Sequence, residues 1–184
     1  MKTMRQKLII VILALFAGIL IVNSGSSLQA AEDWTWPTSM PDGKFSGGKG
    51  TKEDPYLISS CQDLADLSYI IGHSIFEQFS GDYFRLTRDL VFNDDVIVDG
   101  KFNAAKEANF IKYYGLGQER VFSDDEFSGT FDGGGHTISG IYGLRSCFLG
   151  KTDGAIIQNL TIKDSYVIPD NNRLFEVYNT SFFI

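Results

Sequence analysis

The chain has 184 residues, a formal net charge of -7, and a composition that is 43% hydrophobic and 14% aromatic, which bounds it to one modest domain or part of one. Acidic residues outnumber basic ones by 23 to 16 and no Lys/Arg run occurs, which argues against a nucleic-acid partner. Two cysteines are too few for a disulfide scaffold, and 15 Phe with 19 Gly favour an aromatic-rich β protein over a disordered chain.

Residues 1–31 have the layout of a secretory signal peptide. Lys2, Arg5 and Lys7 precede an unbroken apolar run over residues 8–22, and small polar residues follow it. This run is shorter than the roughly 20 residues that span a bilayer. We expect cleavage after Ala30 or Ala31 and a secreted or cell-surface protein. An uncleaved membrane anchor remains the alternative, and it would be the chain's only contact with a membrane.

Residues 32–54 form a Gly/Pro-rich leader in which we expect little regular structure. Residues 55–82 predict an N-terminal cap, made of a strand over 55–58 and an amphipathic helix over about 60–71. Either Ser59 with Gln62 or Ser60 with Asp63 could cap that helix. Four apolar residues then share one helical face: Leu64, Leu67, Ile70 and Ile71.

From residue 83 to residue 184 the pattern changes to short strands broken by Gly, Asp and Asn. The strands are expected at residues 83–87, 96–98, 127–131, 137–141 and 160–163. Ile138, Leu160 and Phe182 recur at intervals of 22 residues, which suggests a repeat. Three short strands per repeat with Gly/Asn corners are typical of a right-handed parallel β-helix, a solenoid in which each rung must stack on another. We therefore predict an all-β solenoid with an N-terminal capping helix, incomplete at the C-terminus.

Several segments carry a resemblance to a known family. In chain order they are residues 45–58, 63–67, 83–90 and 127–140, followed by the weaker segments 147–150 and 155–160. They resemble the opening of bacterial secreted β-helix proteins that carry GLUG repeats. Cys147 and Phe148 stand where the repeat would have Gly and Leu. The structural motif of the resemblance comprises Gly129, Phe131, Asp132, Gly133, Gly134, Gly135, His136, Ile138, Asn159 and Leu160.

The resemblance implies a pectin-lyase-like right-handed β-helix at the cell surface. Such proteins are often adhesin-like, and some are attached to immunoglobulin A metalloproteases. They are usually much longer than this chain, which stops at Ile184 in the middle of a predicted rung. A zinc protease is not expected in this chain, because the sequence lacks His-Glu-x-x-His.

The segment Asp132-Gly133-Gly134-Gly135-His136 has two interpretations. A carboxylate and an imidazole four residues apart could share a metal or activate a nucleophile. The favoured interpretation is a rung corner in which the glycines permit positive φ, Asp132 binds backbone amides and His136 lies on the outer face. Asn159 is likewise interpreted as a corner residue that bonds along the stack.

Three other features are candidate sites. The acidic residues Asp94, Asp95, Asp99, Asp124, Asp125 and Glu126 could bind calcium or serve a lyase with Arg85, Arg88 or Arg145, although a solvated loop is the favoured interpretation. Trp34, Trp36, Tyr113 and Tyr114 could stack on sugar rings or pack against the helix. Export would let Cys61 and Cys147 pair, and the sequence leaves that open.

The leading hypothesis is therefore an exported, adhesin-like β-helix module that binds a glycan or a host surface protein without catalysis. No catalytic residue, metal ligand or cofactor is assigned, with calcium kept as an open possibility. The alternatives are a polysaccharide lyase or hydrolase on the same fold, and a truncated remnant with no activity of its own. Carboxylates converging on one face beside an Arg would favour the enzyme.

Overall fold

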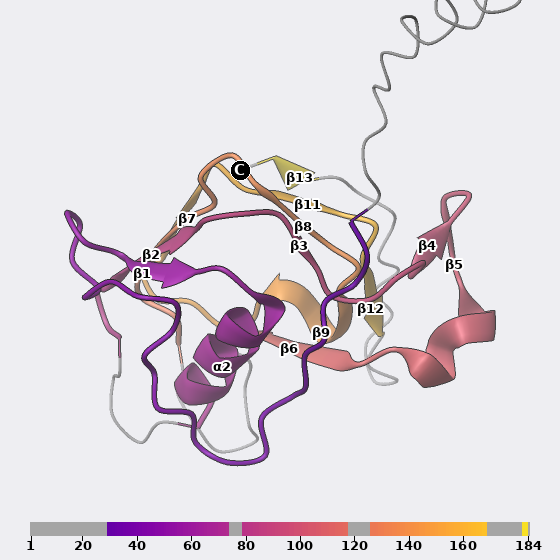
Figure 1. Cartoon of the computed structure of the whole chain (residues 1–184), viewed down its shortest axis with the longest axis horizontal. Coiled ribbons are helices and arrows are strands. Elements are labelled where there is room, and N and C mark those ends of the chain that lie inside the picture. The colour runs from indigo at the N-terminus through magenta and orange to yellow at the C-terminus, as the bar shows by residue number, and fades with distance from the viewer. Residues whose placement is uncertain (1–28, 74–78, 118–125, 169–181, 184) are drawn as a thin grey trace, which may run out of the picture.

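The computed structural model describes residues 29–73, 79–117, 126–168 and 182–183, and in these the chain is mostly β with parallel strands and one α-helix (Figure 1). The strands form three sheets and one separate hairpin. The first sheet contains β1 (Tyr56–Ile58), β2 (Tyr83–Leu86), β7 (Thr130–Asp132) and β10 (Ile156–Gln158), in that order and all parallel.

The other two sheets are also built of parallel neighbours, with one exception. The second sheet contains β3 (Leu90–Val91), β8 (Thr137–Ser139) and β11 (Thr161–Lys163), and β13 (Phe182–Phe183) pairs antiparallel with β11 at its edge. The third sheet contains β6 (Lys112–Leu116), β9 (Tyr142–Leu149) and β12 (Tyr166–Ile168).

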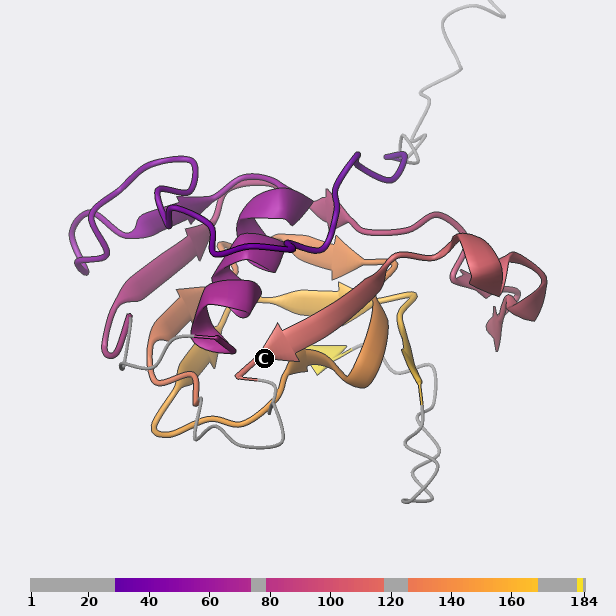
Figure 2. The same cartoon turned by 90° about the horizontal axis from the view of Figure 1, so that it is seen from below.

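The chain visits the three sheets in the same order three times. We call each visit a pass: β2, β3 and β6 form the first pass, β7, β8 and β9 the second, and β10, β11 and β12 the third. Each strand pairs with the strand of the same sheet in the neighbouring pass. Figure 2 shows the segments layered in chain order, from indigo to yellow.

The register of the passes differs from the predicted 22-residue repeat. Ile138 pairs with Ile162, 24 residues further on, and Leu160 lies buried before β11 begins. Phe182 pairs with Ile162, but in the antiparallel direction, so it does not begin another parallel strand. Leu160 and Ile162 both point inward because side chains of a strand alternate with period two, so the apolar pattern fits both registers.

The strand predicted over 96–98 belongs to an antiparallel hairpin and not to a pass. β4 (Ile97–Val98) pairs with β5 (Lys101–Phe102), and the 3₁₀ helix η1 (Ala104–Asn109) follows. The two residues between the strands, Asp99 and Gly100, have φ of 50° and 73°, as a two-residue hairpin turn requires. This insertion projects from the side of the molecule between β3 and β6 (Figure 1).

The helix predicted over residues 60–71 is present as α2 (Cys61–Ile71). Ser60 Oγ accepts a hydrogen bond from Asp63 N at 3.0 Å, which satisfies one of the free amides of the first turn. The Asp63 carboxylate accepts from Ser59 N at 2.9 Å, so the reciprocal bond reaches one residue further back than a capping box would. The apolar face of α2 is buried and packs against β1 and β6.

One core runs through all three passes and under α2. In the first sheet Phe84, Phe131 and Ile157 are register partners, and in the second Leu90, Ile138 and Ile162 are. Phe131 is fully buried, and its ring lies 5.1 Å from that of Phe148. Because burial of apolar surface is the main favourable term in folding, these aligned side chains join one pass to the next.

Replacing Phe131 with alanine tests this arrangement. Loss of a fully buried ring from the middle pass is expected to lower the free energy of unfolding by about 3 to 5 kcal/mol. Urea denaturation followed by circular dichroism measures the change. Ile156→Ala is the matched control, since Ile156 is 54% exposed on the neighbouring strand, and it should cost about 0.5 kcal/mol or less. Equal losses in the two variants would contradict a core centred on Phe131.

Candidate functional site

The four aromatic residues considered as a sugar platform come together, but two of them are inside the protein. Trp34 is 4% exposed and Tyr113 is fully buried, so neither offers a ring face to a ligand. Trp34 Nε1 donates to the backbone oxygen of Phe92 at 2.7 Å. The ring of Trp36 lies 4.6 Å from that of Tyr114, and both residues are partly exposed. The cluster mainly fixes the leader to the core, so the sugar-platform interpretation is wrong for Trp34 and Tyr113.

Glu32 provides a second attachment of the leader. Its Oε2 accepts from Cys61 N at 2.9 Å, at the start of α2, and its Oε1 lies 3.1 Å from Arg88 Nη2. Its backbone N donates to Val91 O at 3.0 Å. The Cys61 thiol beside it is free and buried, and burial raises its pKa. Cys61 is therefore not in a disulfide.

The glycine-rich segment from Asp132 to His136 forms the corner between β7 and β8. Gly134 and Gly135 have φ of 60° and 80°, and Asp132 Oδ1 accepts from Gly134 N at 2.9 Å. His136 Nδ1 lies 3.3 Å from Asp89 Oδ1, on the preceding pass. Asn159, at the equivalent corner of the third pass, has φ of 54° and donates from Nδ2 to Asp132 Oδ1 at 3.0 Å. Side chains thus connect the corners of all three passes.

Backbone also approaches this corner closely. Gly133 N donates to Gln158 O and Gly135 N to Asn159 O, both at 2.8 Å. A Cβ atom at position 133 would lie 2.4 Å from Asn159 O, a distance that real Cβ atoms do not reach. Gly133 is therefore required by contact between passes.

Two alanine variants separate close approach from backbone conformation at this corner. Gly133→Ala is expected to destabilise the fold by about 3 kcal/mol, because the added methyl group meets the backbone of the next pass. Gly135→Ala places its Cβ in open space and bears only the cost of positive φ, about 1 to 2 kcal/mol. Thermal melts of both variants measure the difference. A larger loss for Gly135→Ala would contradict the stacked corner.

Asp132 makes the stability of the fold at this corner depend on pH. Burial acts to raise its pKa, but hydrogen bonds from Asn159 and Gly134 outweigh this effect and hold the pKa below its usual value. A depressed carboxyl pKa stabilises the fold above the unfolded pKa of about 3.9, and that stabilisation is lost as pH falls through the folded pKa. Between about pH 5 and pH 2.5, the melting temperature of Asp132→Asn should therefore fall less than that of the wild type. Equal slopes would show that Asp132 contributes nothing to acid sensitivity.

The candidate calcium ligands do not gather in the part of the chain that the structure describes. Glu126 pairs with Lys151 at 2.6 Å and Asp95 with Lys106 at 2.6 Å. Asp94 Oδ1 accepts from Ala31 N, and Asp99 lies in the hairpin turn. Asp124 and Asp125, and the side chain of Arg145, lie outside the described residues. Among residues 29–73, 79–117, 126–168 and 182–183, no group of three or more His, Cys, Asp or Glu side chains could hold a metal ion.

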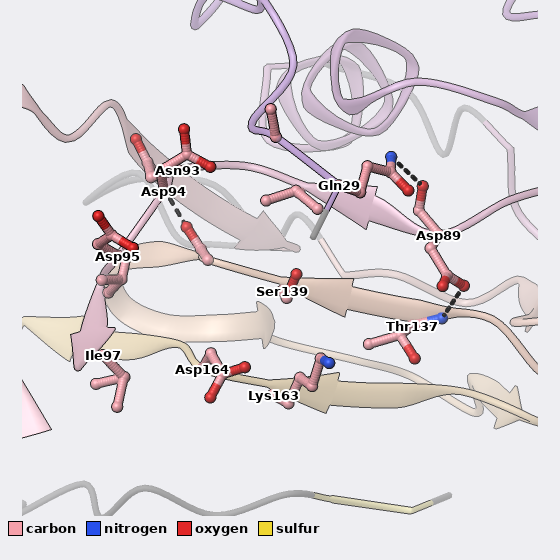
Figure 3. Close-up of a pocket in the computed structure, with 14 residues that line it drawn as sticks. Gln29, Asp89, Asn93, Asp94, Asp95, Ile97, Thr137, Ser139, Lys163 and Asp164 are labelled. Carbon is pink, nitrogen blue, oxygen red and sulfur yellow. Dashed lines mark hydrogen bonds between the residues drawn. The ribbon is translucent and has the colours of Figure 1, made fainter. Parts of the chain in front are cut away.

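A groove that the sequence analysis did not predict lies over the outer face of the second sheet (Figure 3). Its volume is about 670 Å³. The floor is formed by residues that alternate with the core side chains of β3, β8 and β11, and the walls by residues 29–30 and by the start of the hairpin. The polar side chains that line it are Gln29, Asp89, Asn93, Asp94, Asp95, Thr137, Ser139, Lys163 and Asp164.

The groove has more negative than positive charge, because four aspartates line it with one lysine. Some of these carboxylates also hold its walls: Asp89 Oδ1 accepts from Thr137 N at 2.9 Å, and Asp95 pairs with Lys106 on η1. The alternation of Thr137 and Ser139 with Ile138 was visible in the sequence. The pairing of Ser139 with Lys163, and of Thr137 with Thr161, depends on the 24-residue register, which was not visible in the sequence.

No protein-family model, curated protein or solved structure matches this chain. The resemblance to GLUG-repeat proteins therefore stays a prediction. In the described ranges, no helix has the length and apolar character needed to span a bilayer; the apolar run over residues 8–22 lies outside them.

Proposed function

We propose that this protein is an exported, adhesin-like right-handed β-helix module whose groove binds a glycan without transforming it. The observation that carries the proposal is the polar groove over the second sheet. Support for the β-helix comes from the three passes through the three sheets in a constant order. α2 lies against β1 and β6, where an N-terminal cap of such a column would lie.

The side chains of the groove suit a polyhydroxylated ligand. Carboxylates accept hydrogen bonds from sugar hydroxyls, while the hydroxyls of Thr137 and Ser139 both donate and accept. Nine of the 14 lining residues have polar side chains, so the lining suits a ligand rich in hydroxyl groups better than an apolar one. Since four aspartates face one lysine, repulsion disfavours a polyanionic glycan. We therefore expect a neutral or amino-sugar glycan.

A second candidate is a polysaccharide lyase or hydrolase on the same fold. Several carboxylates and Lys163 line one groove, so groups that could act as a general acid or base lie around one cavity. This arrangement favours an enzyme more than the same groups spread over a flat surface would. The two candidates differ in turnover. A binding module returns the glycan unchanged, whereas a lyase releases unsaturated sugars and a hydrolase releases new reducing ends.

The binding test uses the full chain, exported and purified from a bacterial host. Deacetylated chitohexaose, cellohexaose and hexagalacturonate serve as the cationic, neutral and anionic probes in calorimetry, with mass spectrometry to detect products. We expect the cationic or neutral probe to bind, hexagalacturonate to bind at least tenfold more weakly, and no probe to be cleaved. Cleavage would favour the enzyme. Binding of a host protein with no glycan binding would contradict the proposal.

One substitution localises the binding to the groove. Asp164 has φ of 48°, a conformation that asparagine tolerates, so Asp164→Asn removes the charge with little change of backbone. Loss of a charged hydrogen-bond acceptor should weaken binding of chitohexaose about tenfold. Asp153→Asn is the matched control, because Asp153 is exposed on a loop outside the groove, and it should bind as the wild type does. Equal affinities of the two variants would place the ligand elsewhere.

A further inference from the structure

The residues on either side of the predicted signal-peptide junction lie along the groove. Gln29 Nε2 donates to Asp89 O at 3.1 Å, and both Gln29 and Ala30 line the cavity (Figure 3). Ala31 N donates to Asp94 Oδ1 at 2.8 Å. The Ala30–Ala31 peptide bond therefore lies between a wall of the groove and a carboxylate that faces it.

We propose that hydrolysis of the Ala30–Ala31 bond opens the groove and leaves the new α-ammonium of Ala31 paired with Asp94. The inference rests on the proposed export of the chain. One water molecule is consumed: its oxygen goes to the Ala30 carboxylate, and the Ala31 nitrogen gains the protons of an amine, which is charged at neutral pH. No other reactant is needed.

The new terminus stays in place because the next residue, Glu32, is held by contacts that do not involve the signal peptide. Glu32 is bonded through its backbone N to Val91 O and through its carboxylate to Cys61 N and Arg88. Ala31 N therefore remains within reach of Asp94 after the cut. An amide donor becomes a charged donor on the same acceptor, and charge-assisted hydrogen bonds are roughly twice as strong as neutral ones.

Cleavage one residue later has a different result. It would leave the α-ammonium of Glu32 on the carbonyl of Val91, which is a neutral acceptor, and would remove the residue that contacts Asp94. The cut after Ala30 thus places a positive charge on a carboxylate. In both cases Gln29 and Ala30 leave the groove, and the backbone oxygen of Asp89 becomes available to a ligand.

The ion pair is tested on the α-amine itself, without any glycan. The full chain is exported from a bacterial host, its N-terminus is determined by intact mass, and the pKa of its α-amine is measured by competitive acetylation. The charged groups nearby are Asp89, Asp94, Asp95 and Asp164, with Lys163 in the groove, Lys106 on Asp95, and the adjacent Glu32 paired with Arg88. We expect a terminus at Ala31 with a pKa about one unit above the ordinary 7.7 to 8.0.

Three variants separate the effect of Asp94 on the α-amine pKa from that of the other charges in the groove. Asp94→Asn should return the α-amine to its ordinary pKa, Asp94→Glu should keep most of the increase, and Asp95→Asn should change it by less than half as much as Asp94→Asn. Circular dichroism establishes that each variant is folded. A terminus other than Ala31, or a wild-type α-amine with an ordinary pKa, overturns the proposal.

Opening is measured with a thiol placed on the floor of the groove. Ser139→Cys is prepared in the exported, processed chain and in a chain kept uncut by Leu13→Arg and Leu15→Arg, which interrupt the apolar run. Maleimide labelling of the introduced thiol in the folded proteins, mapped by mass spectrometry, should be at least tenfold faster in the processed chain. Equal rates overturn the opening. Because neither readout uses a glycan, failure of the probes to bind contradicts only the proposed function.

Discussion

The structure depends on the alignment of inward-facing apolar side chains from one pass to the next. The strands are two to eight residues long, and isolated strands of that length cannot order themselves against the loss of backbone entropy. Phe84, Phe131 and Ile157 lie in register on three successive strands, so each side chain is covered only when its neighbours are in place. Burial and the parallel hydrogen-bond ladders therefore form together, as they do in repeat proteins.

Local sequence signals predicted the elements whose formation depends on short-range features of the chain. Ser60 and the apolar spacing that follows it indicate α2, because a cap and a 3.6-residue period are both short-range features. Strands β8 and β11 lie within their predicted ranges because Ile138 and Ile162 alternate with polar residues. β9 was not predicted, since Gly143, Arg145 and Ser146 interrupt its apolar pattern. Asp99-Gly100 is typical of a two-residue hairpin turn. The sequence analysis assigned only a strand to the preceding Val96-Ile97-Val98 and did not predict the hairpin.

What the sequence could not supply was register, and the groove depends on it. A shift of two residues keeps every inward side chain inward, so Leu160 and Ile162 are equally good partners for Ile138 on the pattern alone. The choice is made by three-dimensional contacts at the corner, where Gly133 lies against Asn159 and the Asn159 amide reaches Asp132. The same contacts bring Thr137 beside the strand of Lys163, and the groove follows from that placement.

The antiparallel strand β13 has an effect on how molecules can meet. It occupies the hydrogen-bonding edge of β11, so that row of backbone groups is unable to recruit a strand from another molecule. In the described sheets the corresponding edges at β10 and β12 carry no such cover, and β10 presents the exposed side chain of Ile156. A strand from another molecule would therefore meet the free backbone of β10 or β12 in those two sheets, whereas in the second sheet, which bears the groove, it would meet only the two residues of β13.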